Sequence, residues 1–374
     1  MEYSKLIFLC GARDFHAIDW YRSAEEQLNK ENLCILTDLI AGEGFQKIVS
    51  EDDNVYSLII LDKLLFRGQS NIGNLWRNIL KLLMLPLQII LIKKFNKRNP
   101  NSIYHVHSMY YLWLAAGANI DFVGTPQGSD ILVKPFKSKI YKTLSIWALR
   151  SAKYITVDSK KMRDKVFEIS GIEAKIIQNG IDIKAIGGGR IFTSKKVLIR
   201  DRLVSIRGFS PLYRIEELFI ARNIENNAKD FPISLIYPFY ENKYKQKILK
   251  YLTANDEDLG RVNRTQMYEL LFESQLVISI PSSDSSPRSV YEAIFCGSAV
   301  AITYHPYYDT LPICMKERII LVDLDNENWL LNATKDANLI ITSYFIPCEK
   351  ALDLFDQRRS FKRILSLINE SNCE

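Results

Sequence analysis

The stretch LVISIPSSD, residues 276–284, followed directly by SSPRSVYEAIFCGSAVAIT, residues 285–303, decides the fold. LVISI and AVAIT are short apolar runs typical of buried strands, and RSVYEAIF between them has a helical pattern. A strand, a helix and a second strand in this order predict a parallel β-α-β unit. Ser286 and Pro287 are the expected N-cap and first helical residue. The carboxylates of Asp284 and Glu292 then lie on the two sides of a helix start.

Strand-like and helix-like segments alternate along the whole chain, which indicates parallel sheets covered by helices on both faces. A chain of 374 residues exceeds what one core usually supports. Three glycines at 187–189 mark the likeliest linker, inside residues 179–196. We therefore predict two Rossmann-like, doubly wound α/β domains, 1–185 and 186–355, that face a cleft holding any ligand.

Composition narrows the classes of protein. A hydrophobic content of 47% and a charged content of 25% describe a globular chain rather than a disordered one. The six cysteines form no CxxC pair and no secretory signal precedes the first apolar run, so we expect a reduced, cytoplasmic compartment and inert thiols. The net charge of +6 accompanies no nucleic-acid recognition motif, and no nucleic-acid partner is expected.

Positive charge is concentrated in one segment. Residues 63–120 contain eight Lys or Arg and no Asp or Glu, and within 63–98 these charges flank an apolar run. The uninterrupted part, 82–92, is too short to cross a bilayer, which needs about 20 residues. We predict that 63–98 contacts an anionic membrane surface, and the further basic run 134–142 favours this prediction. The alternative is a buried core helix with a solvated basic end.

The loop and helix of 281–295 suit a charged ligand. A helix that starts at the end of a parallel strand presents backbone N–H groups and a partial positive charge, which favour a phosphate or diphosphate. Arg288 in the first turn can add a bidentate contact. Glu292 can reach neighbouring hydroxyls such as those of a ribose, and Asp284 can face the group beyond the diphosphate. An ordinary capped surface helix remains the alternative.

Several ordered motifs resemble one family. Asp284 and the SSPRSVYEAIFCGSAVAIT that follows it are similar to the donor-site signature of family-4 retaining glycosyltransferases of the GT-B fold, with Asp284 where that family usually has Glu. Five further stretches resemble successive landmarks of the family, in the same order: HVHSMYYLWLAAG, GTPQGSDIL, SAKYITVDSKKMRDKV, IIQNGIDIKAI and VSIRGFSPLYRIEELFIA. In this fold the C-terminal tail, here 356–374, often packs back onto the first domain.

The resemblance implies a role for each matched residue on the donor side. Glu292 would bind the nucleotide ribose, Asp284 the transferred sugar near its reacting carbon, and Arg207 the diphosphate as negative charge develops. Tyr213 replaces a family lysine, and the neighbouring Arg214 is expected to supply that charge. The expected catalytic residues are Asp284, Arg207 and Gln127, and the donor-binding residues are Glu292, Ser289, Arg288, Arg214 and Ser286.

On the other side of the predicted cleft, Gln127 stands where many relatives carry His. Gln does not exchange a proton near neutral pH, so we assign it a positioning role. Retaining transfer does not need a base there, because the departing phosphate can accept the acceptor's proton. The acceptor-binding residues are predicted to be Gly11, Arg13, Asp14 and His16, while Asp130 is expected to cap or orient the loop.

No metal or other cofactor is expected. His105 and His107 share one face of a predicted strand, but metal binding would need a third ligand, so they are interpreted as structural. The Asp323–Asp325 pair around Leu324 follows a late strand, and GT-B enzymes do not use such a pair to bind metal.

The resemblance therefore implies a retaining glycosyltransferase at the cytoplasmic face of a membrane. It would move a sugar from a nucleotide-sugar donor to a lipid-linked saccharide for a bacterial surface polymer, such as an O-antigen or a capsule. Two alternatives stay open. One is a catalytically inactive binding or scaffold subunit, because Asp284, Gln127 and Tyr213 depart from the family pattern. The other is a sugar-nucleotide epimerase of similar architecture.

Overall fold

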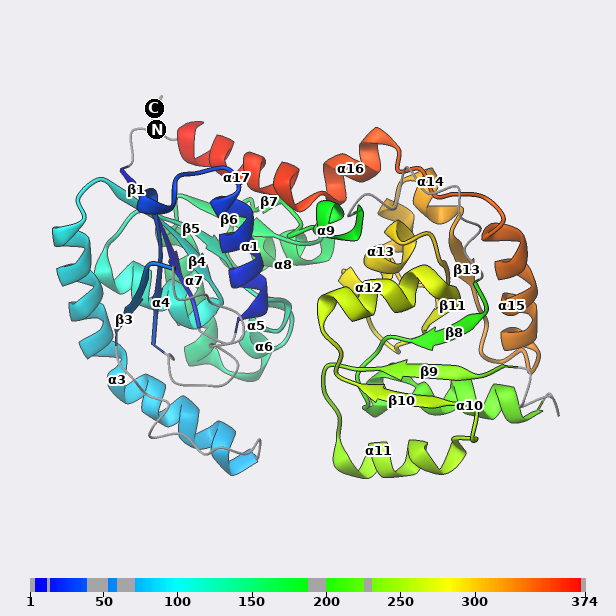
Figure 1. The fold of residues 1–374 in the computed structure, drawn as a ribbon. Coiled ribbons are helices and arrows are strands. Elements are labelled where there is room, and N and C mark those ends of the chain that lie inside the picture. Colours follow the sequence, from blue (N-terminus) through cyan, green and yellow to red (C-terminus); the bar gives the residue numbers. More distant parts are fainter. Residues whose placement is uncertain are drawn as a thin grey trace. The chain divides into compact units, whose positions relative to one another are not determined.

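The computed structural model describes residues 4–11, 14–38, 53–58, 71–187, 200–224 and 231–370, and the chain folds as two compact units (Figure 1). The first unit contains Met1–Asn179 with Gln357–Glu374, and the second contains Gly180–Asp356. The division precedes the glycine run because Ile186, on α9 (Ile183–Gly187), belongs to the core of the second unit. The rest of the predicted linker, from 188, lies outside the described residues.

The first unit is built on a seven-stranded parallel sheet in the order β3-β2-β1-β4-β5-β6-β7. Its strands are β1 (Lys5–Leu9), β2 (Leu33–Thr37), β3 (Val55–Ser57), β4 (Ser102–His107), β5 (Phe122–Thr125), β6 (Tyr154–Val157) and β7 (Lys175–Ile176). Its helices are α1 (Phe15–Glu25), α3 (Asn71–Arg98), α4 (Met109–Ala118), α5 (Gly128–Leu132), α6 (Lys134–Lys137), α7 (Lys139–Ser151), α8 (Lys160–Ser170) and α17 (Gln357–Glu370), with the short η1 (Lys30–Asn32).

The second unit has a six-stranded parallel sheet in the order β10-β9-β8-β11-β12-β13. Its strands are β8 (Arg202–Ser205), β9 (Ile233–Ile236), β10 (Glu257–Gly260), β11 (Ser274–Ser279), β12 (Ala299–Ile302) and β13 (Ile319–Leu321). The helices that follow α9 are α10 (Ile215–Ile224), α11 (Asn242–Ile248), α12 (Arg264–Glu273), α13 (Arg288–Phe295), α14 (Ile313–Lys316), α15 (Trp329–Ile340) and α16 (Glu349–Phe355), with η3 (Pro211–Tyr213), η4 (Leu249–Tyr251) and η5 (Tyr308–Thr310).

Alternation of side chains explains why each sheet is covered on both faces. On β1, Leu6 and Phe8 pack into the core that contains α1 and α17, while Ile7 and Leu9 pack into the core under α4. On β12, Val300 belongs to the core with α13 and Ala301 to the core with α15. The predicted doubly wound α/β architecture is therefore confirmed in each unit.

In both sheets the first strand of the unit lies in the middle, so each sheet has one topological switch point. This point lies between β1 and β4 in the first unit, and between β8 and β11 in the second. Parallel doubly wound sheets bind ligands outside the carboxyl ends of the strands at such a point. The loops after these four strands are therefore the places to search for a site.

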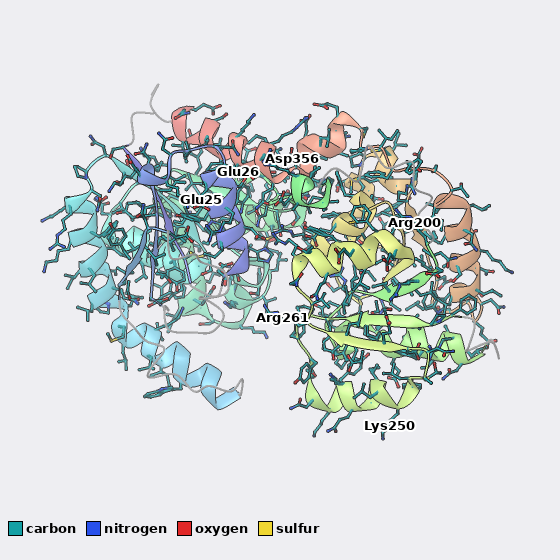
Figure 2. The ribbon with its side chains drawn as sticks, in the orientation of Figure 1. Glu25, Glu26, Arg200, Lys250, Arg261 and Asp356 are labelled. Atoms are coloured by element: carbon teal, nitrogen blue, oxygen red, sulfur yellow. The ribbon has the colours of Figure 1, made fainter. Side chains whose placement is uncertain are left out.

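The C-terminal helix α17 packs on α1 and completes the first unit (Figure 1). Phe361 and Ile364 are buried together with Trp20 of α1. Gln357 Nε2 donates to the backbone oxygen of Asp19 at 2.6 Å, and Ser23 Oγ donates to the backbone oxygen of Gln357 at 3.1 Å. Glu26, labelled with Glu25 in Figure 2, forms an ion pair with Arg358.

Residues 71–98 of the basic apolar segment form α3, a helix of 28 residues with Pro86 inside it, and residues 63–70 lie outside the described residues. Its inner side contacts α4: Gln88 is fully buried and Ile92 belongs to the core. Its outer side leaves large apolar side chains in solvent, namely Trp76, Ile79, Leu82, Leu83, Leu87 and Ile90. No helix within the described ranges has the length and apolar character that crossing a membrane requires.

Candidate functional site

Arg207 and Asp284 meet at the switch point of the second unit. Arg207 follows β8 and Asp284 follows β11, its neighbour in the sheet, and their side chains form an ion pair. Arg207 Nε also donates to Ser279 Oγ at 2.6 Å, and the guanidinium lies 5.7 Å from the centre of the Tyr213 ring. The structure thus brings together two of the predicted catalytic residues. Tyr213, which replaces a family lysine, packs on the cation instead of supplying one.

The loop before α13 differs in one detail from the prediction. The helix begins at Arg288, and Pro287 occupies the N-cap position without a side-chain hydrogen bond, so Ser286 is not the N-cap. The carbonyl oxygen of Pro287 accepts from the Val290 N–H at 2.9 Å, which closes the first turn tightly. Ser286 remains in the loop and Ser289 in the first turn, and both follow Asp284 in the sequence.

Glu292 lies inside the second unit rather than on its surface. Its exposed fraction is 5%, and it accepts a hydrogen bond from Tyr268 of α12 at 3.2 Å. Arg288 lies one helical turn earlier, with Nε 3.4 Å from Glu292 Oε1. A buried carboxylate needs such partners, because burial without them would be strongly unfavourable. This burial argues against an ordinary surface helix, in which the acidic residue would face solvent.

Arg214 holds the loop that carries Asp284. Its guanidinium donates to the backbone oxygens of Ile280 at 2.9 Å and Pro281 at 2.6 Å. His305 Nε2 lies 3.0 Å from the same Pro281 oxygen, and Thr303 Oγ1 donates to it at 3.1 Å. In this arrangement the Arg214 guanidinium is hydrogen-bonded to backbone carbonyl oxygens. These hydrogen bonds would have to break before Arg214 could contact a nucleotide-sugar donor.

Beside the switch point of the first unit, Asp14, which follows β1, is hydrogen-bonded to Gln127, which follows β5. Asp14 caps α1 by accepting from the N–H groups of His16 and Ala17, and its other oxygen accepts from Gln127 Nε2 at 2.9 Å. Burial raises the pKa of Asp14, although the nearby His16 and these donors oppose the rise. Gly11 lies against Tyr111, whose hydroxyl would be only 3.1 Å from an added Cβ. Arg13 lies outside the described residues.

Two pockets share Asp14 and Gln127. The smaller, of about 300 Å³, is also lined by His16, His107 and Asn179, and we call it the histidine pocket. The larger, of about 620 Å³, is also lined by Lys81, Tyr110, Trp113, Lys134 and Tyr141, and we call it the aromatic pocket. All of these residues belong to the first unit, so three predicted acceptor residues, Gly11, Asp14 and His16, line one pocket or the other.

His105 and His107 lie side by side, as expected for alternate residues of one strand, with ring centres 4.3 Å apart. Burial lowers the pKa of His105 to about 3 and lowers that of His107 well below its usual range, so both rings are neutral near pH 7. His105 Nε2 is 2.9 Å from Thr125 Oγ1, whereas His107 Nε2 is buried with no hydrogen-bond partner among the described residues. Among those residues, no cluster of three metal-ligating side chains exists.

Asp130 supports the loop that carries Gln127, as its sequence context suggested. One oxygen accepts from the backbone N–H groups of Met109 and Gln127, and the other from Lys134 Nζ at 2.7 Å and Tyr141 OH at 3.1 Å. Sequence reasoning missed Tyr268, Tyr141 and Lys81, because their partners are distant in the chain. In the sequence, the aromatic residues within 110–113 are the feature that could have indicated the aromatic pocket, which they line together with Gly11.

Comparison with known protein families identifies one part of the chain. Residues 65–185, about a third of the sequence, match the model of Glycosyltransferase Family 4. This segment, which lies in the first unit, is therefore a family-4 glycosyltransferase domain. A search of curated protein sequences finds no match to this glycosyltransferase.

Solved structures share the fold of the glycosyltransferase over nearly its whole length. HepE of Anabaena, solved with UDP and glucose, superimposes with a TM-score of 0.68 at 15% identity, covering 98% of this chain and 100% of its own. Sucrose-phosphate synthase of Thermosynechococcus elongatus gives 0.69 at 12% identity, with 99% of each chain covered. The UDP-GlcNAc 2-epimerase of Neisseria meningitidis gives 0.61 at 10% identity, covering 98% and 100%. At these identities the likeness shows the GT-B fold alone.

Proposed function

We propose that this glycosyltransferase uses the switch point of its second unit to bind the nucleotide-sugar. The supporting observation is the joint placement of Arg207, Asp284 and Glu292 around β11 and α13, in a chain whose residues 65–185 match the family-4 model. Arg207 stabilises charge on the diphosphate leaving group, Glu292 accepts from the ribose hydroxyls, and Asp284 faces the sugar. UDP-sugars are the first donors to test, because the similar HepE was solved with UDP.

The proposed chemistry retains the configuration of the sugar and uses no metal. The bond between the sugar's anomeric carbon and the diphosphate oxygen breaks, the acceptor oxygen forms the new bond on the same face, and the departing phosphate takes the acceptor's proton. Gln127 positions Asp14 rather than exchanging a proton, as its 2.9 Å hydrogen bond to that carboxylate supports.

We expect turnover to continue at full rate after treatment with a chelator, because the proposed chemistry uses no metal. Loss of turnover that Mg²⁺ or Mn²⁺ restores would overturn this expectation.

We propose further that the acceptor is a saccharide linked to a lipid, and that the enzyme works at the cytoplasmic face of a membrane on a bacterial surface polysaccharide. The support is the outer side of α3, where Leu83 is 69% exposed and Ile90 is 57% exposed. The same helix ends with Lys93, Lys94, Lys97 and Arg98, and each such cation near an anionic leaflet contributes on the order of 1 kcal/mol.

Vesicle binding tests the membrane contact. Substitution of Leu83 and Ile90 by Glu is expected to abolish co-flotation with phosphatidylglycerol vesicles, because it places charge on the buried side of the contact. Leu339→Glu is the matched control, since Leu339 is 74% exposed on α15 of the second unit. Equal flotation of the Leu83 and Ile90 variant and the wild type would contradict the proposal.

A panel of nucleotide-sugars, assayed with and without bacterial lipid extract, tests the reaction. We expect nucleotide release that depends on the extract and that Arg207→Met reduces by at least a hundredfold. The likeness to UDP-GlcNAc 2-epimerases makes epimerisation the second candidate. It predicts an altered sugar nucleotide in the absence of any acceptor. Tight donor binding with neither reaction would point to the inactive scaffold subunit.

A further inference from the structure

The aromatic pocket is lined by three helices that expose apolar or basic side chains. Lys81 and Leu82 come from α3, Lys134 from α6 and Tyr141 from α7. On α6 and α7, Phe136 is 53% exposed and Ile140 is 76% exposed. The apolar surface is therefore not confined to α3. It occurs on three helices that line one pocket, where a molecule with an apolar chain would enter.

The wall of the pocket suits a ligand that is partly apolar and partly anionic. Trp113 packs edge-on to Tyr141 with ring centres 5.0 Å apart, and Tyr110 lies 6.4 Å from Trp113, which gives a continuous aromatic surface. Lys81 Nζ lies over the rings of Tyr110 and Tyr111, at 4.5 and 5.0 Å, and 3.7 Å from the buried carboxylate of Asp38, and these contacts orient the ammonium group. A pocket of this size binds a molecule much larger than one sugar ring.

One polar atom in this wall also lacks a protein partner. Trp113 Nε1 is buried, and no hydrogen-bond acceptor contacts it among the described residues. A buried N–H without an acceptor is unfavourable, and a ligand oxygen placed against it would relieve this cost. The carboxylate of Asp130, in contrast, already has four donors, and its charge is largely compensated.

We propose that the aromatic pocket binds the diphosphate and the first part of the chain of an amphiphilic acceptor, a glycosyl diphosphate of a long apolar alcohol. Lys81 and the Trp113 N–H contact the diphosphate, and the chain leaves past Leu82 along the exposed side of α3. The sugar of the same acceptor occupies the histidine pocket, where His107 Nε2 has no protein partner among the described residues. Asp14 and Gln127, which line both pockets, hold the junction between sugar and diphosphate. This inference rests on the proposed lipid-linked acceptor and assigns its place.

Binding of farnesyl diphosphate, compared with farnesol and inorganic diphosphate, tests the assignment by calorimetry without detergent. We expect farnesyl diphosphate to bind most tightly, Lys81→Met to weaken it at least tenfold, and Trp113→Phe to weaken it severalfold. Thermal unfolding checks that both variants are folded. Lys250→Met is the matched control, because Lys250 is an exposed lysine of the second unit, labelled in Figure 2. This variant should bind farnesyl diphosphate as tightly as the wild type.

Arg207→Met separates this pocket from the donor site, and it should leave the binding of farnesyl diphosphate unchanged. The assignment is overturned if Lys81→Met and Trp113→Phe bind like the wild type, if Arg207→Met abolishes binding, or if farnesol binds as tightly as its diphosphate. Sugar transfer onto lipid extract by the wild type would then still support the proposed function. Tight pocket binding without any consumption of nucleotide-sugar would contradict the proposed function and leave the pocket assignment intact.

Discussion

Glu292 shows how a residue that looks like surface from the sequence becomes part of a site. Its position in the motif was predictable, but its burial depends on Tyr268, which belongs to another helix. Tertiary contacts of this kind leave no local pattern in a sequence. The same holds for Arg214, which the charge alone suggested as a donor ligand, and which the structure places on backbone carbonyls.

Replacing Glu292 tests the ribose contact. Glu292→Gln keeps the shape but removes the charge, and hydrogen bonds to charged groups are worth about 1.5–3 kcal/mol. We expect donor affinity to fall about 10- to 100-fold in a nucleotide-binding titration. Glu269→Gln is the matched control, since Glu269 is an exposed residue of α12. Unchanged donor affinity in Glu292→Gln would remove Glu292 from the site.

Asp14 gives a prediction about pH. Because its pKa is raised, the folded protein keeps this proton to a higher pH than the unfolded chain does. The contribution of this group to stability therefore falls as pH rises from the ordinary pKa of 3.8 to the raised one, and ionised Asp14 is destabilising at neutral pH. Asn is an equally good N-cap. Asp14→Asn should unfold at the same or a higher temperature at pH 7.

The same variant should lose function. Asp14 must be ionised to accept fully from Gln127 and from an acceptor hydroxyl, so transfer should decline on acidification through its raised pKa. Asp14→Asn should raise the acceptor KM about tenfold, leave the donor KM unchanged and remove this acidic limb. A variant that loses thermal stability at pH 7 while keeping the wild-type pH profile would refute both assignments.

Among the elements, those with a strong side-chain pattern were predictable. The continuous apolar runs of β11 and β12 identify strands buried on both faces. β10, with the sequence EDLG, could not be predicted, because it is a polar edge strand that is defined by backbone pairing with β9. The full length of α3 was also not predictable, because Pro86 usually ends a helix. The start of α13 moved by one residue because Pro287 closes its first turn.

Two cysteines interpreted as inert are brought together by separate elements. Cys314 of α14 and Cys348, just before α16, have sulfur atoms 2.6 Å apart. Burial raises the pKa of Cys314. Burial acts in the same direction on Cys348, but the bond from Cys314 and backbone N–H groups outweigh it and lower its pKa. A thiol of lowered pKa beside a second thiol favours disulfide formation by thiol–disulfide exchange.

We therefore expect oxidised glutathione to convert this pair to a disulfide, with reduced glutathione as the product. Intact-mass analysis should show the loss of two hydrogen atoms, and the second unit should gain about 3 kcal/mol of stability. Cys314→Ser and Cys348→Ser should each abolish this intramolecular product. A stable glutathione adduct on the wild type, without the internal bond, would be the contrary result.

At the scale of the whole molecule, the two-unit architecture followed from chain length and the alternation of elements. The position of the division, after Asn179, could not be predicted in this way, because it depends on the core in which Ile186 is buried. Placing α17 in the first unit came from the family resemblance, since its apolar face alone could cover either sheet. The contacts of Phe361 with Trp20 show which face it covers.

The contribution of α17 can be measured directly. Phe361 is fully buried, and Phe361→Ala should destabilise the first unit by about 3–5 kcal/mol, because it leaves a cavity against α1. Lys362→Ala, at the next and exposed position, should change stability by less than about 0.5 kcal/mol. Denaturant unfolding with a spectroscopic probe in each unit measures the free energy of unfolding of both variants. A Phe361→Ala loss no larger than that of the control would show that α17 is dispensable.

The return of α17 to the first unit also sets the order in which the protein can be completed during synthesis. The ribosome makes the first unit before the second, yet the apolar side of α1 stays uncovered until Phe361, Ile364 and Ile368 have left the exit tunnel. The unit that is begun first is therefore finished last. We therefore expect a nascent chain to expose Trp20 and its neighbours to chaperones throughout translation of the second unit.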